Sequence, residues 1–343
     1  MQRLMAYGLD LEMLVGQAHT LNLVLAHSCE VSMIRNCIGT VKSVINFFRQ
    51  SALRDGLLKE AAESIGASHS NLISLCETRW SEKHLAIERF AEMYSIVFET
   101  LQVLQNSSRD YASQAYQLRL AIESSQFVIS LLIMRKVFSY TSNLNKVLQT
   151  INIDLIETCK YVNSIRKTFE EIQNDEEYLK IIIDAKTLMG TESIQAPRVT
   201  ARQTGRNNIP ADTAEIYYKR NIFYPFLDHM QSELAARFSQ HHERIGSLRL
   251  LLPAFIKDEN RALNNLKEMQ EMYLPNENIE NVLSEYRLWC IKWKENNEEL
   301  TAIETFEKCN KHFFPLIHKL LKILATLPVS TSTAERSFST LKS

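Results

Sequence analysis

The amino-acid sequence predicts an almost wholly α-helical protein. Only eight glycines and seven prolines interrupt its 343 residues, and alternating apolar and polar runs, which indicate strands, are nearly absent. Apolar residues instead recur every three or four positions, as on one face of a helix. Because 45% of the residues are hydrophobic, the chain can bury a sizeable core and form more than one structural unit.

Apolar spacing predicts the helices of the first half. Helices are expected over 11–28, 31–49 and 53–65, the last closed by Gly66 because glycine accepts the left-handed conformation that follows a helix. Residues 82–190 should form three or four long helices, one of them with Tyr116 and Leu120 on a buried seam.

The second half continues the pattern after an interruption at 190–211. Asp212 and Glu215 have the spacing of a capping box, which predicts a helix to about Phe238. Shorter helices are expected around 245–252, 258–272 and 278–296, with a long one over 300–325. Trp289 and Trp293 are one turn apart and should pack together in the core.

Charge and cysteine usage restrict the partners. The formal net charge of −1 gives no global field toward nucleic acid or a membrane, so any DNA contact must be local. The six cysteines form no C-x-x-C pair and suit a reducing, intracellular compartment. The longest apolar run, Phe127–Met134, is too short to span a bilayer. We therefore expect no membrane partner and no small-molecule substrate.

The stretch 327–342 carries the most specific pattern, Leu-Pro-Val-Ser-Thr-Ser-Thr-Ala-Glu-Arg-Ser-Phe-Ser-Thr-Leu-Lys. Pro328 ends the preceding apolar run, and Ser332 with Glu335 forms a capping box that starts a new helix. By spacing alone Glu335 is a capping carboxylate. The stretch resembles the C-terminal dimerisation region of hAT-superfamily transposases. That resemblance implies a second role for Glu335, as the third acid of an Asp-Asp-Glu metal site on a ribonuclease-H-like core.

A second stretch, 16–25, resembles the hAT pattern Cys-x-x-His-x-Leu-Asn-Leu. His19, Leu21, Asn22 and Leu23 match, whereas Gly16 stands where the family has cysteine. From the residues alone His19 is an ordinary half-buried helix histidine. The resemblance implies a position beside the nuclease core, in contact with DNA, and the loss of the cysteine puts that role in doubt.

Arginines at two further places are candidates for DNA contact. In hAT relatives an Arg-Trp pair recurs at the position of Arg79-Trp80, which implies phosphate contact and base stacking; Trp80 as a core anchor is the competing reading. The linker 191–211 holds Arg198, Arg202 and Arg206 and, between 197 and 206, no acid. It is either an exposed loop or a phosphate-contacting patch.

The two catalytic aspartates of the family have no counterpart here. In the family they lie on strands before the His motif, and Asp10 and Glu12 are surface carboxylates in the wrong context. The resemblance therefore implies a helical insertion domain with only the start of the final helix of an incomplete nuclease core, truncated at both ends. A two-metal nuclease needs converging carboxylates, so we expect no nuclease activity and no cofactor, with Mg²⁺ relevant only in an intact transposase.

The sequence thus predicts a transposon-derived nuclear protein that acts by dimerisation, with DNA as a further partner. The alternative is the C-terminal piece of an active Asp-Asp-Glu transposase. The expected dimerisation residues are Phe313, Phe314, Leu320, Leu324, Leu327, Pro328 and Phe338. The expected segments are 1–82 beside the nuclease core, 83–190 and 212–298 as two parts of the insertion domain, 191–211 as linker, and 299–343 as the dimerisation region.

Overall fold

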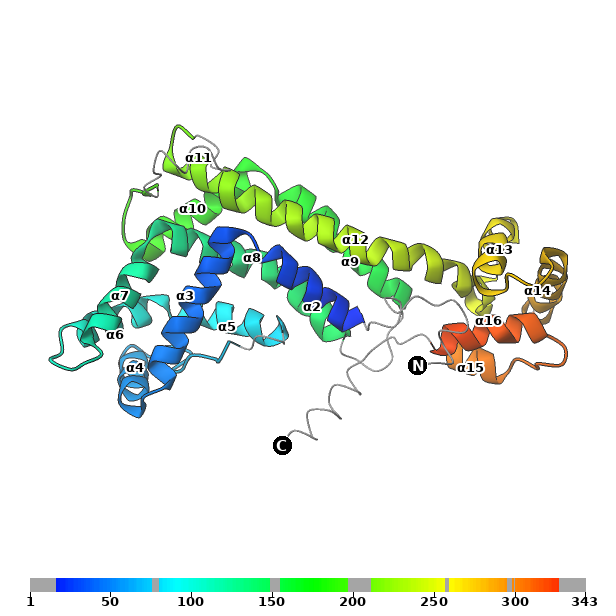
Figure 1. Cartoon of the computed structure of the whole chain (residues 1–343), viewed down its shortest axis with the longest axis horizontal. Coiled ribbons are helices and arrows are strands. Elements are labelled where there is room, and N and C mark those ends of the chain that lie inside the picture. The colour runs from blue at the N-terminus through cyan, green and yellow to red at the C-terminus, as the bar shows by residue number, and fades with distance from the viewer. Residues whose placement is uncertain are drawn as a thin grey trace. The chain divides into compact units, whose positions relative to one another are not determined.

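The computed structural model describes residues 17–75, 80–148, 155–196, 211–256, 259–294, 298 and 300–326. Throughout these residues the regular structure is helical, with no strand (Figure 1). The all-α prediction is therefore confirmed. The chain divides into two compact units: an N-terminal unit of residues 21–147 and 163–234, and a C-terminal unit of residues 1–20, 148–162 and 235–343.

The N-terminal unit is built around α8, whose side chains between Phe127 and Phe138 are largely buried. The Phe127 ring meets Phe90, and the Phe138 ring meets Phe226, both edge to face. The helices that contribute to this unit are α2 (Gln17–Ser28), α3 (Ser32–Arg49), α4 (Ala52–Ser64), α5 (Trp80–Glu92), α6 (Tyr94–Gln105), α7 (Ala112–Glu123), α8 (Ser125–Leu148), α9 (Leu155–Ile172), α10 (Asp175–Met189), α11 (Ala214–Tyr218), η2 (Lys219–Phe223) and α12 (Tyr224–Leu248).

Helix ends in this unit follow local chemistry. Gly66 has a φ of 65°, and the N–H groups of Gly66 and Ala67 donate to Glu63 and Ala62 at 3.0 Å. This is the Schellman arrangement, which needs a left-handed residue and therefore favours glycine. The predicted helix end at Gly66 is confirmed.

A π-helical stretch interrupts the long rod from α11 to α12. Within η2 the backbone hydrogen bonds join residues five apart, as in a π-helix. Tyr218, directly before η2, forms a side-chain hydrogen bond with another segment. The Tyr218 hydroxyl donates to the Gln195 carbonyl at 2.6 Å, and the Gln195 N–H donates to Ser125 Oγ at 3.1 Å. Both peptide groups of Gln195 are thus held, which fixes the chain just before residue 197.

The C-terminal unit is a small helical cluster with its own core. From residue 249 onward its described residues form two short 3₁₀ turns and four helices, and Figure 1 shows these helices gathered together in yellow to red. The Trp289 and Trp293 rings lie 5.6 Å apart, edge to face, so the predicted pairing is confirmed. These elements are η3 (Arg249–Leu251), η4 (Pro253–Phe255), α13 (Glu259–Tyr273), α14 (Ile279–Trp293), α15 (Ala302–Glu307) and α16 (Pro315–Thr326).

Several predicted boundaries are wrong. The described residues between 82 and 190 form six helices, not three or four, because short turns such as 106–111 separate them. Tyr116 and Leu120 are exposed, since α7 buries the opposite face through Ala115 and Ile122.

Two further predictions, for helices in the second half of the chain, are also wrong. Thr213, not Asp212, is the N-cap of α11, and its side chain accepts from the Ile216 N–H at 3.2 Å. The predicted helix over 300–325 is two helices, because a non-helical turn follows α15 and α16 starts anew at Pro315. Proline at the first helical position lacks an N–H that would have no partner there.

No single helix in the described residues has the length and apolar composition of a membrane span. Only α7 taken together with Ser125–Leu144 of α8, bent by 65°, reaches them.

Candidate functional site: the α14–α16 region

Helix α14 organises the C-terminal unit, because its inner face carries the two tryptophans of the core and contacts the elements around it. Asn278 caps its start by accepting from the Glu280 N–H at 3.0 Å. Towards the interior it presents Val282, Glu285, Tyr286, Trp289, Cys290 and Trp293, all of them buried.

Trp289 is fully buried and joins three elements. Its indole Nε1 donates to the Leu251 carbonyl of η3 at 2.8 Å. Its ring lies 5.0 Å from the Phe314 ring, edge to face, just before α16. The Tyr286 hydroxyl adds a bond to the Leu250 carbonyl at 3.1 Å. Buried Trp and Tyr thus satisfy their polar atoms with the carbonyls of a tight turn.

Glu285 caps α16 from α14. The Ile317 N–H, in the first turn of α16, donates to Glu285 Oε1 at 2.6 Å. The first N–H groups of a helix lack partners within the helix, and a carboxylate also complements the positive end of the helix dipole. Burial raises the pKa of the Glu285 carboxyl, against the opposing effect of the backbone N–H groups of Ile317 and Leu316.

Lys292 makes the matching contact at the end of α15. Its Nζ donates to the carbonyl of Lys308, the C-cap residue of α15, at 3.2 Å. It also lies over the rings of Trp289, Trp293 and Phe314 at 4.9, 5.2 and 5.4 Å. A cation favours the negative end of a helix and the face of an aromatic ring. Glu285 and Lys292, two turns apart on α14, therefore hold the neighbouring helices by opposite ends.

The predicted dimerisation residues fall into different environments. Phe313 is 73% exposed, whereas Phe314 and Leu324 are partly buried against the core of the same unit. Leu320 is fully buried in that core, so in this structure it supports the region and cannot contact a partner. Leu327, Pro328 and Phe338 lie outside the described residues, as does Glu335.

Of the predicted DNA-contacting residues, the described part of the chain includes His19 and Trp80. His19 and Trp80 lie on α2 and α5, where the structure describes their backbone. Arg79, Arg198, Arg202 and Arg206 lie outside the described residues. Their role stays a prediction.

Titratable groups in the described part of the chain do not assemble a metal site: no cluster of three His, Cys, Asp or Glu side chains occurs there. Cys29, Cys37 and Cys309 are free and buried, and Cys290 is buried as well. Burial raises the pKa of the Cys309 thiol to about 11.

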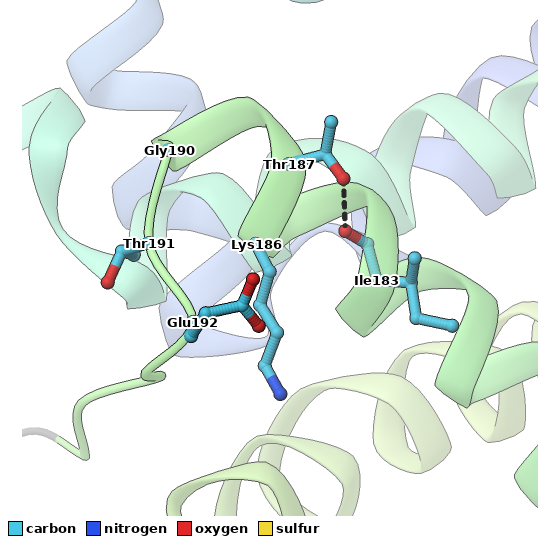
Figure 2. Close-up of a pocket in the computed structure, with 6 residues that line it drawn as sticks. All are labelled: Ile183, Lys186, Thr187, Gly190, Thr191 and Glu192. Atoms are coloured by element: carbon cyan, nitrogen blue, oxygen red, sulfur yellow. Dashed lines mark hydrogen bonds between the residues drawn. The ribbon is translucent and has the colours of Figure 1, made fainter.

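A surface hollow of about 370 Å³ lies at the end of α10, lined by Ile183, Lys186, Thr187, Gly190, Thr191 and Glu192 (Figure 2). Thr187 Oγ1 donates to the Ile183 carbonyl at 2.9 Å, and Lys186 pairs with Glu215 at 2.8 Å. Its polar groups are thus engaged in holding the helix end, so the hollow presents no reactive constellation.

Sequence reasoning missed the two polar contacts that organise α14. Glu285 is buried, although charged residues are expected on the solvated side. Lys292, seven residues further on and close to the same side of the helix, is exposed. The signal that could have found them is Pro315, which marks a helix start in need of a cap. The exposed Leu288 and Ile291 were also missed.

Two segments of the chain, one of which begins with α14, match known protein families. Residues 278–343, from the N-cap of α14 onward, match the hAT family C-terminal dimerisation region. Residues 15–121, which contain α2 to α7, match the ZBED1 RNase-like helical domain. Over these two regions the chain therefore matches hAT-type families, as its sequence motifs predicted.

Among curated proteins it is similar to the 52 kDa repressor of the inhibitor of the protein kinase, at 24% identity to both the human and the mouse protein. Each similarity covers 92% of this chain and 44% of the relative, so the chain spans less than half of the length of these relatives. No solved structure matches it.

Proposed function

We propose that this protein acts by binding a second copy of itself through residues 278–343. The observation that carries the proposal is the match of that region to a dimerisation family. Packing within the unit supports it, because Glu285, Trp289 and Lys292 hold α14, α15 and α16 as one body. A rigid body loses little conformational entropy when it associates, so more of the contact energy remains as affinity.

The experiment is sedimentation equilibrium on the full chain over about a hundredfold range of concentration. We expect the average mass to rise from that of a monomer to that of a dimer and to stop there. A monomer mass at every concentration would refute self-association. Growth beyond the dimer would indicate aggregation through an apolar surface.

We further propose that the protein is a regulator without nuclease activity. The relatives are named as a repressor, and the sequence offers one candidate acid, Glu335, where two-metal chemistry needs several. The alternative is part of an Asp-Asp-Glu transposase. Incubation with DNA and Mg²⁺ or Mn²⁺ should give no strand cleavage. Cleavage that is lost in Glu335→Ala would favour the transposase.

A nuclear location and DNA contact complete the proposal, both of them implied by the hAT resemblance. The candidate contacts are Arg79, Arg198, Arg202 and Arg206, with Trp80 as a stacking surface and His19 beside it. Each arginine that neutralises a phosphate adds about one unit to the slope of log affinity against log salt. The triple variant of Arg198, Arg202 and Arg206 should therefore lower that slope; an unchanged slope would exclude the linker.

A further inference from the structure

The outer face of α14 carries apolar side chains that the described residues of its own unit leave exposed. Leu288 is 58% exposed and Ile291 is 65% exposed, although the residues beside them, Trp289 and Cys290, are buried. Leu288 lies one turn before Lys292, whose Nζ reaches the Phe314 ring. Large apolar side chains that gather on an exposed helix face indicate an interaction surface.

The spacing on this face is that of a helix that packs against another helix. Asn281, Ser284, Leu288 and Ile291 follow one another at intervals of three and four residues. Such intervals make one seam along a helix, as in coiled coils. The side chains of this seam are large in its C-terminal half and small at Ser284. If a second copy of the helix packs against it in the opposite direction, Ile291 of one helix lies over Ser284 of the other.

Charged residues along the edge of the seam also favour antiparallel packing of two copies of α14. Glu280, Arg287 and Lys294 are spaced by seven residues, are all exposed and lie along one edge. When two identical helices pack antiparallel about the level of Arg287, Glu280 of each copy meets Lys294 of the other. Two attractive pairs then form against one pair of like charges, Arg287 with Arg287.

We propose that the outer face of α14, centred on Leu288 and Ile291, is the contact between two copies of this chain, packed as an antiparallel pair about a twofold axis. The inference rests on the proposed self-association and names the surface that performs it. The second copy is the occupant because α14 opens the matched dimerisation region and because its charge order complements its own reverse. An isologous contact of this kind closes at two copies.

The first experiment breaks the apolar seam in the full chain. Leu288→Glu with Ile291→Glu would place four carboxylates in the contact, so the dimer dissociation constant should rise more than about a hundredfold. The matched control is Leu263→Glu on α13, 43% exposed in the same unit and outside the matched region, which should leave the constant unchanged. Circular dichroism and the unfolding midpoint must stay as in the wild type for both proteins.

The second experiment tests the direction of packing by charge exchange. Glu280→Lys or Lys294→Glu alone should weaken the dimer about threefold to tenfold, since each pair occurs twice. The combined variant restores both pairs and should return to within about twofold of the wild type. Arg287→Ala should tighten the dimer by a few fold because it removes the like pair.

The outcomes separate this inference from the proposed function. A wild-type chain that stays monomeric refutes self-association itself and, with it, this contact. A wild-type dimer that survives Leu288→Glu with Ile291→Glu keeps the proposed function and overturns the α14 surface. Variants that lose stability without any change in mass mean that another part of the same chain covers the face, which also overturns the inference.

Discussion

The two faces of α14 differ in burial, and we therefore assign different roles to them. The inner face places Trp289 in a dry core and directs Glu285 at the start of α16. Lys292, exposed at the border of that face, contacts the end of α15. The outer face carries Leu288 and Ile291 in the open. Neighbouring residues such as Leu288 and Trp289 thus serve different purposes. Stability belongs to the inner face, and association is assigned to the outer one.

The largest expected effect breaks this comparison at its centre. Trp289→Ala removes the largest fully buried side chain and its bond to the Leu251 carbonyl, so the free energy of unfolding of the C-terminal unit should fall by about 3–5 kcal/mol. Leu288→Ala, one residue away, should change it by less than about 0.5 kcal/mol. Denaturant unfolding, followed by tryptophan fluorescence or circular dichroism, measures both. Equal losses for the two variants would contradict the division into faces.

A smaller effect is expected at the cap of α16. Glu285→Ala leaves the buried Ile317 N–H without its acceptor and should cost about 1–3 kcal/mol. Glu285→Gln keeps an amide oxygen in the same place and buries no charge, so it should cost less. If the alanine and glutamine variants lose the same free energy of unfolding, the hydrogen bond from the Ile317 N–H is not what stabilises the contact between α14 and α16.

Glu285 also predicts a pH dependence. Its folded pKa is raised by burial, so its contribution to stability is present below the unfolded value and is lost as the pH rises through the folded pKa. The glutamine variant does not ionise, so its free energy of unfolding relative to the wild type should rise as the pH rises from about 4.5 toward neutrality.

Glu177 in the N-terminal unit provides the opposite case and the smallest expected effect. Hydrogen bonds from Lys136 and Lys180 hold the pKa of the Glu177 carboxyl at about 2. A lowered folded pKa stabilises the fold above the unfolded value, and this contribution is lost as the pH falls from about 4.5 toward 2. Glu177→Gln should flatten the acid limb of the stability curve of its unit and leave the curve near neutrality parallel to the wild type. An acid limb that is unchanged in the variant would exclude Glu177 as its source.

Sequence patterns predicted the helices better than their breaks. Apolar spacing and Gly66 are local signals, and the elements they predicted, α3 and α4, are present. The seam of Tyr116 and Leu120 failed because periodicity shows that a helix has two faces but not which neighbour covers which face. The break between α15 and α16 was missed because residues 308–314 contain no glycine or proline that would mark it.

The candidate site could be predicted only in part. The motif at 327–342 indicated the region of association, which the family match supports. Leu320 was assigned to the contact because its hydrophobicity is the same whether it packs inward or outward, and the fold buries it. Leu288 and Ile291 escaped notice because the tryptophans beside them dominate the pattern of α14. Exposure of these two side chains needed the tertiary structure.

Cross-linking of two different variants tests the central claim most directly. Within α14, positions 280 and 294 are about 21 Å apart along the axis, and in the antiparallel pair each lies beside the other position of the second copy. Full chains carrying Glu280→Cys and Lys294→Cys are mixed and treated with a bismaleimide much shorter than that span, with the wild type measuring the background from the native cysteines. The account predicts a covalent dimer in the mixture and none above background in either variant alone. A mixture that gives no more covalent dimer than the separate variants would contradict it.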